Sequence, residues 1–376
     1  MSASSQNSPV LVVKIGSSSL VDRQGRLDAA FLAVVARQLK AVADLGWRPV
    51  LVSSGAVASG LGILGLPARP NGLSERQALA AIGQASLAHR WQEALAAEDL
   101  VAAQVLLTNA DFTDRARYLN LTAAFRSLFA YHAVPVINEN DTVAVEELTV
   151  GDNDRLSALV ATQLHAQLLV LLTDIDGVYD ADPRTHPEAK LVREMHGVPP
   201  KMLGAAGGGG KLGRGGMRSK LEAARLASGA GVATVIAPAR VARVIERVVD
   251  GDETLGTRIH PRAEASADGR RRWLAVARKV KGQIHIDAGA AAALVRQGKS
   301  LLPIGITAVS GRFERGDTVA VVGADGEELA RGLVSLSSVE LALVAGKRAA
   351  AANAALGYAM PKAAIHRDNL LVLAPE

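Results

Sequence analysis

The chain has 376 residues, 49% apolar and 21% charged, a composition that suits a globular protein of two or three domains and excludes a disordered one. The sequence has no cysteine, which excludes disulfides, thiolate catalysis and Cys-ligated zinc. It also shows no signal peptide and no run of ~18 apolar residues, so we expect a soluble cytoplasmic protein. The net charge of +5 equals the excess in residues 258–280, which hold seven Lys or Arg and two Asp or Glu, so the flanking regions lack the charge of a nucleic-acid binder.

Apolar runs typical of buried strands alternate with helical patterns along the first 250 residues. We expect strands at 10–15, 49–52, 101–107, 134–137, 168–172 and 232–236. We expect helices at 27–45, 74–98, 114–131, 154 onward, 217–229 and 241–249. Ser74 and Gln77 have the spacing of a capping box, and the GxGxxG string at 60–65 is interpreted as a loop. The alternation predicts a mostly parallel sheet with helices on both faces, a three-layer α/β/α fold.

The stretch 207–220, GGGGKLGRGGMRSK, is half glycine and carries four basic residues. Glycine lets backbone N–H groups converge on an anion, and the helix expected from Met217 adds its N-terminal dipole. A flexible linker is the alternative, but the basic residues favour a phosphate-binding loop that closes over a nucleotide. It is not a Walker A loop, because the one Gly-Lys-Ser in the chain, at 298–300, lacks the required upstream glycine.

Polar side chains follow several of the expected strands. Lys14 ends the first strand, Ser53 and Ser54 end the second, and Thr173 and Asp174 end the fifth. Clustered Asn and Asp occur at 138–141 and 152–154, where they could be ordinary turn residues or could bind the ammonium and carboxylate of an amino acid. Ligands bind at the carboxyl edge of a parallel sheet, so we expect a site there.

The chain closely resembles the glutamate 5-kinases of the amino-acid kinase family in six ordered motifs: VVKIGSSSL, LVSSGA, PVINENDTV, GDNDRLSALVA, LLTDIDGVYDADPR and GRGGMRSKLEAA. The resemblance implies that ATP, assisted by Mg2+, phosphorylates the side-chain carboxylate of L-glutamate to L-glutamyl 5-phosphate, the first step of proline biosynthesis. A carboxylate is already a nucleophile at neutral pH, so such an enzyme needs positioning and charge neutralisation rather than a catalytic base.

The resemblance also assigns site residues. It implies catalytic roles for Lys14, Lys220 and Asp152, with Asp152 and Asp154 orienting the lysines or holding the active-site loop. It implies substrate binding by Ser54, Asp141 and Asn153, and no protein ligand for a metal. It implies nucleotide contacts by Lys14, Thr173, Asp174, Arg214, Gly215, Gly216, Met217, Arg218, Ser219 and Lys220. Arg214 stands where the family usually has threonine, so a hydroxyl contact is lost or an arginine contact replaces it.

We expect a catalytic domain at 1–257, a basic linker at 258–280 and a β-rich domain at 281–376. The last has a helix at 288–296, strands near 301–309, 317–322 and 328–335, and a turn at 323–326. It resembles a PUA domain. Such domains elsewhere bind RNA, but its near-neutral charge makes RNA binding the less favoured interpretation.

Several expectations about partners and alternatives accompany the resemblance. It implies feedback inhibition by L-proline, a homo-oligomer (dimer or tetramer), transfer of the product to glutamyl-phosphate reductase, and no membrane partner. Two alternatives remain: a related kinase acting on acetylglutamate, aspartate or UMP, and an RNA-binding protein with a vestigial kinase fold. The arginines at 270–272 are expected to bridge domains or subunits through acidic partners.

Overall fold

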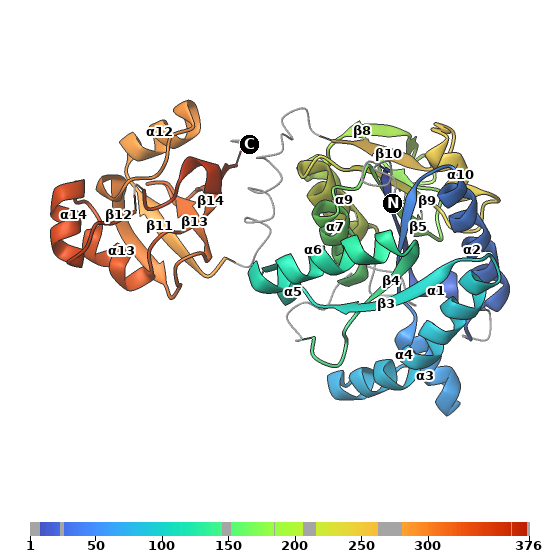
Figure 1. Ribbon diagram of the computed structural model, residues 1–376. Helices are drawn as coiled ribbons and strands as arrows, with labels where there is room; N and C mark the ends of the chain where they lie inside the picture. The colour runs from blue at the N-terminus through green and yellow to red at the C-terminus, as the bar shows by residue number, and fades with distance from the viewer. Residues whose placement is uncertain are drawn as a thin grey trace. The chain divides into compact units, whose positions relative to one another are not determined.

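The computed structural model describes residues 8–22, 26–113, 115–144, 152–183, 185–205, 216–261, 280–361 and 363–373. The chain divides into two compact units, 1–263 and 264–376. Figure 1 shows both units and labels many of their helices and strands.

The first unit is built on a mixed sheet of eight strands within the described residues. The strands are β1 (Val10–Ile15), β2 (Arg48–Ser53), β3 (Val101–Leu107), β4 (Ala133–Glu139), β5 (Leu168–Thr173), β8 (Glu194–His196), β9 (Ala233–Pro238) and β10 (Thr257–His260). They lie in the order β3-β4-β2-β1-β5-β9-β10-β8, and all neighbouring pairs are parallel except β9 with β10. Every residue of β1 and β5 is buried, as their continuous apolar runs predict for central strands. A separate hairpin pairs β6 (Val178–Tyr179) with β7 (Leu191–Val192).

Helices cover both faces of this sheet, with α6, α7 and α9 on one side and α2 and α10 on the other (Figure 1). Their bounds are α1 (Ser17–Leu20), α2 (Ala29–Asp44), α3 (Ala56–Leu64), α4 (Leu73–Ala96), α5 (Ala110–Thr113), α6 (Arg115–Ala130), α7 (Asp152–Gln163), α8 (Pro200–Ala205), α9 (Met217–Gly229) and α10 (Val244–Val249). The predicted three-layer fold with a mostly parallel sheet is therefore confirmed.

Two local predictions about the segment between β2 and β3 are wrong. The GxGxxG string is not a loop: Gly60 and Gly62 lie inside α3, and Gly65 caps its C-terminal end. A Cβ on Gly60 would lie 2.1 Å from the backbone oxygen of Leu79 in α4, so glycine is needed there for close helix packing. The expected capping box of Ser74 and Gln77 is also absent, because Glu75 accepts the hydrogen bond from the Gly72 N–H at 3.2 Å. That arrangement leaves the side chain of Gln77 available for another contact.

The sheet also extends further along the chain than the sequence indicates. Residues 258–260, placed in the expected linker, form most of β10 and pair with β8 and β9. Thr257, the first residue of β10, is polar but fully buried. Its hydroxyl donates to the Val192 carbonyl at 2.6 Å and accepts from the Val178 N–H at 2.8 Å. The arginines at 270–272 lie outside the described residues.

The second unit has a five-stranded sheet, within its described residues, in the order β12-β11-β13-β14-β15. The strands are β11 (Gly282–Ile286), β12 (Ile306–Gly311), β13 (Thr318–Val322), β14 (Glu328–Leu333) and β15 (Leu370–Val372). The accompanying helices are α12 (Ala288–Gln297), η3 (Pro303–Gly305), α13 (Ser338–Val344), α14 (Ala349–Leu356) and η4 (Arg367–Asn369). The turn predicted between β13 and β14 is present, with Gly326 at φ +80° donating to the Gly323 carbonyl at 3.1 Å. The prediction of a small β-rich unit is confirmed.

Candidate active site

The carboxyl ends of the central strands bring polar residues from distant parts of the sequence to one edge. Lys14 is in register with Val52 of β2 and Leu171 of β5. The turn after β2 is tied to β1, because the Ser54 N–H donates to the Ile15 carbonyl at 3.1 Å. Gly55 follows at φ +111°, a conformation that favours glycine and lets α3 start directly after the turn.

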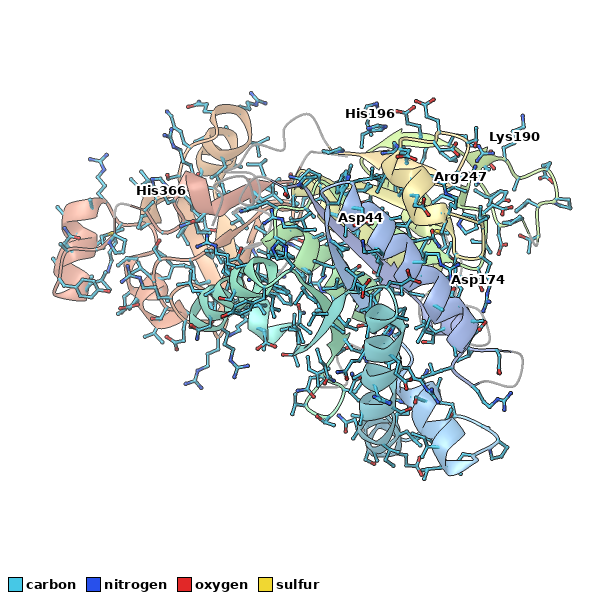
Figure 2. All side chains as sticks on the ribbon, turned by 45° about the vertical axis from the view of Figure 1, so that its right-hand side comes forward. Asp44, Asp174, Lys190, His196, Arg247 and His366 are labelled. Carbon is cyan, nitrogen blue, oxygen red and sulfur yellow. The ribbon has the colours of Figure 1, made fainter. Side chains whose placement is uncertain are left out.

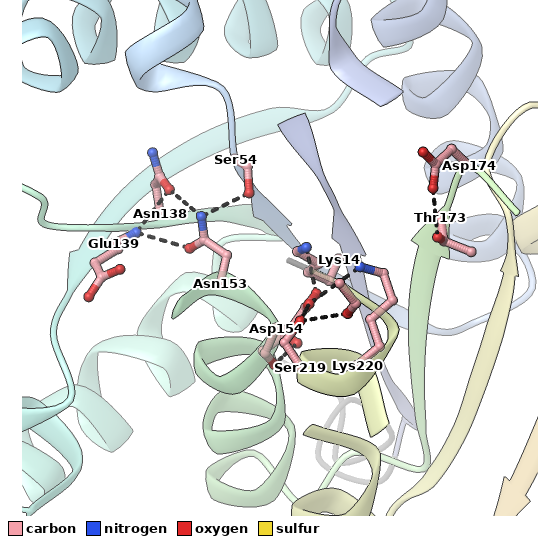
Figure 3. A network of polar contacts seen from close by, with 12 residues as sticks. Lys14, Ser54, Asn138, Glu139, Asn153, Asp154, Thr173, Asp174, Ser219 and Lys220 are labelled. Atoms are coloured by element: carbon pink, nitrogen blue, oxygen red, sulfur yellow. Dashed lines mark hydrogen bonds and ion pairs between the residues drawn. The ribbon is translucent and has the colours of Figure 1, made fainter. Parts of the chain in front are cut away.

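One buried carboxylate lies between two buried lysines. Asp154, in the first turn of α7, contacts the Lys14 ammonium at 2.5 Å and the Lys220 ammonium, from α9, at 3.4 Å (Figure 3). The Ser219 hydroxyl donates to the same carboxylate at 2.7 Å. Asp154 has no exposed surface, and the two lysines are 4% and 5% exposed. The cluster therefore joins β1, α7 and α9 into one rigid centre.

Burial and mutual attraction shift the pKa values of Asp154 and Lys14 in this cluster. Burial alone would raise the pKa of Asp154, but the attraction of Lys14 and Lys220 and hydrogen bonds from Lys14 and Ser219 lower it to about 2. Burial lowers the pKa of Lys14 from its ordinary value; Asp154 opposes this effect and Lys220 adds to it. Two buried ammonium groups at one edge of the sheet are suited to an approaching anion such as a phosphoryl group.

A second network of neutral polar groups begins one residue away, at Asn153. The side-chain nitrogen of Asn153 donates to the Ser54 hydroxyl at 2.9 Å and to the side-chain oxygen of Asn138 at 3.0 Å (Figure 3). The Glu139 N–H donates to Asn138 at 2.9 Å and to Asn153 at 3.3 Å. The sequence motifs contain Asn138, but its position at the centre of this network comes only from the structure.

Apart from Lys14, the expected nucleotide residues that the structure describes lie at the end of β5 and at the start of α9. Thr173 ends β5, and its hydroxyl donates to Asp174 at 3.2 Å, with Thr173 buried and Asp174 exposed (Figures 2 and 3). Gly216 is the N-cap of α9, followed by Met217 and Arg218. The exposed Arg218 guanidinium pairs with Glu222 on the same helix at 3.0 Å. The structure thus brings Ser219 and Lys220 to the lysine centre, whereas Arg218 faces Glu222.

Some expected residues cannot be placed in full. Arg214 and Gly215 lie outside the described residues, as does most of the glycine-rich stretch. Asp152 opens α7, but its side chain is likewise not among those described. Asp141 is half-buried in the turn after β4.

A family model for the "Amino acid kinase family" matches residues 9–238, well over half of the chain. The chain belongs to the amino acid kinase family. A "PUA domain" model matches residues 282–356. These two matches agree with the family and the second domain that the sequence motifs indicated.

Individual members of the kinase family match over nearly the whole chain. The "Glutamate 5-kinase" of Pseudomonas putida (strain W619) is 46% identical over 363 residues, which is 96% of this chain and 97% of that protein. The "Glutamate 5-kinase" of Pseudomonas savastanoi pv. phaseolicola (strain 1448A / Race 6) is 47% identical, covering 96% and 98%. Among solved structures, the UMP kinase from Bacillus anthracis aligns at a TM-score of 0.48 with 14% identity, covering 68% of this chain and 97% of that one.

Kinase family membership raises the question of a metal ion. The described residues contain no group of three or more side chains suited to hold one, and Asp154 is already paired with both lysines. Mg2+ in phosphoryl-transfer enzymes is held largely by substrate phosphates and water. In the part of the chain that is described, no helix is of a length and hydrophobicity to cross a membrane.

Proposed function

We propose that this chain transfers the γ-phosphoryl group of ATP to the side-chain carboxylate of L-glutamate, forming L-glutamyl 5-phosphate and ADP, the first step of proline biosynthesis. The observation that carries the proposal is the buried Lys14–Asp154–Lys220 cluster beside the Ser54–Asn153 network. The high identity to proteins called glutamate 5-kinase supports glutamate as the acid. A phosphoryl group and an amino acid would thereby meet at one sheet edge.

The proposed roles of Lys14, Lys220 and Asp154 follow from their contacts. Lys14 and Lys220 neutralise charge on the transferring phosphoryl group, and Asp154 holds both ammonium groups in place before substrate arrives. Asp152, two residues earlier at the start of α7, is the third catalytic residue that we propose. The attacking oxygen belongs to the substrate carboxylate, so the enzyme abstracts no proton.

The acid and the nucleotide would occupy opposite sides of this cluster. Ser54, Asn153 and Asp141 would bind the amino acid. Thr173 and Asp174, with the residues from 214 to 220, would bind ATP. Mg2+, bound to the ATP phosphates, would reduce their charge.

The remaining expectations extend this proposal. L-Proline would inhibit by competing at the amino-acid site, and the enzyme would act in the cytoplasm as a dimer or tetramer that transfers its unstable product to glutamyl-phosphate reductase. The catalytic domain would occupy the first compact unit, and the PUA domain would follow the basic linker without binding RNA.

A substrate panel tests the function. The purified chain is incubated with ATP and Mg2+ and one of four acceptors: L-glutamate, N-acetyl-L-glutamate, L-aspartate or UMP. We expect ADP release with L-glutamate, inhibited by L-proline, and little with the others. ADP release with another acceptor but none with L-glutamate would refute the assignment.

A further inference from the structure

Helix α4 carries three polar side chains at seven-residue intervals: Gln77, Gln84 and Trp91. Seven residues are nearly two helical turns, so the three side chains lie in one row on one face of the helix. Each of them bonds to a different segment of the candidate amino-acid site. We call these three residues the α4 row.

Trp91 fixes the turn after β2. Its indole N–H donates to the Ser53 hydroxyl at 2.8 Å, and both side chains are fully buried. An indole can only donate, so Ser53 must accept there and direct its own proton elsewhere. That proton goes to the Ser54 carbonyl at 2.9 Å. Trp91 therefore fixes, through Ser53, the position of the Ser54 backbone carbonyl, and Ser54 is a residue that we propose to contact the substrate.

Gln84 fixes the direction of the second network. Its side-chain oxygen accepts from the Asn138 amide nitrogen at 2.7 Å, which turns the Asn138 oxygen toward Asn153. Asn153 then donates to both Asn138 and Ser54. Since the Ser54 hydroxyl accepts this bond, its proton is directed away from Asn153, where it can be donated to a ligand oxygen.

Gln77 reaches the third segment. Its side-chain nitrogen donates to the Ala144 carbonyl at 3.0 Å. Ala144 closes the turn after β4, because its N–H donates to the Asn140 carbonyl at 3.1 Å. This turn contains Asp141, so the row bonds directly to two of the segments from which amino-acid contacts are expected and reaches the third, at Asn153, through Asn138.

Trp91 also belongs to the hydrophobic core, but Gln77 and Gln84 are not required to pack α4 on the protein. Leu79, Leu87 and Leu95 of the same helix are each at least 95% buried and supply its apolar contacts. Gln77 and Gln84 are half-buried polar residues, which would add nothing to a purely apolar contact.

We infer that the α4 row is a positioning device that sets the hydrogen-bond direction of the amino-acid pocket, so that Ser54 acts as a donor to a substrate carboxylate. The inference rests on the proposed function for the identity of the ligand. It predicts that loss of one contact in the row weakens binding of the acid but leaves binding of ATP and the lysine centre unchanged.

The test compares Gln84→Met and Ser53→Ala with the control Gln92→Met. Gln92 is exposed on the same helix. Methionine keeps the length of glutamine and removes its hydrogen bonds, and Ser53→Ala removes the Trp91 contact without opening a large cavity. We expect KM for L-glutamate to rise about five- to tenfold in the two row variants, since a tenfold change matches the loss of one hydrogen bond. KM for ATP and kcat should change less than about twofold.

Amide hydrogen exchange of the free protein provides a second readout that needs no activity. We expect exchange at 51–57 to quicken in Ser53→Ala, exchange at 136–144 to quicken in Gln84→Met, and neither to change in Gln92→Met. Equal changes in both KM values, or row variants that match the control in both assays, would overturn the inference. A native chain that does not phosphorylate glutamate would refute the proposed function instead, and the exchange data would still decide whether the row holds these segments.

Discussion

Replacing Asp154 by asparagine is expected to destabilise the protein strongly, because it removes the buried carboxylate that contacts two buried ammonium groups. The carboxylate lies 2.5 Å from Lys14 and 3.4 Å from Lys220. At an effective dielectric constant of about 20, each contact contributes about 5 to 7 kcal/mol of Coulomb energy, much of which offsets the cost of burying the charges. Breaking such a buried pair typically costs about 3 to 5 kcal/mol. We expect a loss of this size in the free energy of unfolding, measured by chemical denaturation at pH 7.

A surface pair of the same geometry provides the control. Lys40 and Asp44 of α2 also lie 2.5 Å apart, but their side chains are 33% and 62% exposed. Figure 2 labels Asp44. Asp44→Asn should therefore cost less than about 0.5 kcal/mol. Equal losses in Asp44→Asn and Asp154→Asn would refute the argument that burial makes the Asp154 contacts strong.

Catalysis should respond to the same change through Lys14. Burial already lowers the pKa of this lysine, and Asp154 is the group that opposes the effect. In Asp154→Asn the Lys14 pKa falls further, so its charge is lost at a lower pH than in the native chain. The kcat of the variant should decline as the pH rises, beginning at a lower pH than in the native enzyme. Identical pH profiles would contradict this role.

Three further results are expected. The stabilisation that Asp154 contributes should be constant above about pH 5 and should be lost as the pH falls toward its pKa of about 2, because the folded-state pKa lies below the unfolded value. An acid titration in which Asp154→Asn loses as much stability as the native chain would argue against this. Gly60→Ala should lower the melting temperature, because the added Cβ would lie 2.1 Å from the Leu79 backbone oxygen. Gly62→Ala on the same helix should be neutral or stabilising, because a Cβ there would have no neighbour within 4 Å. Ser54→Ala should raise KM for L-glutamate about tenfold and spare KM for ATP, and a change confined to kcat would remove Ser54 from substrate binding.

The sequence predicts the sheet well because its central strands are unusually apolar. The run at 10–15 matches β1 in both bounds, and the strand expected at 168–172 differs from β5 by one residue. The strands β8 and β10 are not predicted from the sequence, because they are short and lie toward one edge of the sheet, where the apolar periodicity is weak. The helix that contains the glycine motif at 60–65 is not predictable from the sequence, because the close approach of α4 that explains Gly60 is a tertiary contact.

The site was predictable as a set of motifs but not as an arrangement. Lys14, Asp154 and Lys220 belong to three separate motifs, and only the fold shows that one carboxylate contacts both lysines. Gln77 shows the limit most clearly. Its spacing from Ser74 indicates a helix cap, yet its side chain bonds to Ala144, 67 residues further along the chain. Local patterns cannot distinguish a capping residue from one that bonds to a distant loop.

The most direct test of the account is the turnover of Lys220→Ala with ATP and L-glutamate. Lys220 is almost fully buried beside Asp154 and would supply preorganised charge to the transferring phosphoryl group. Removal of such a contact should lower kcat by about 10² to 10³-fold, followed as ADP release together with trapping of the acyl phosphate by hydroxylamine. A Lys220→Ala enzyme that is folded and has near-native kcat would contradict the proposed role of the lysine cluster in phosphoryl transfer.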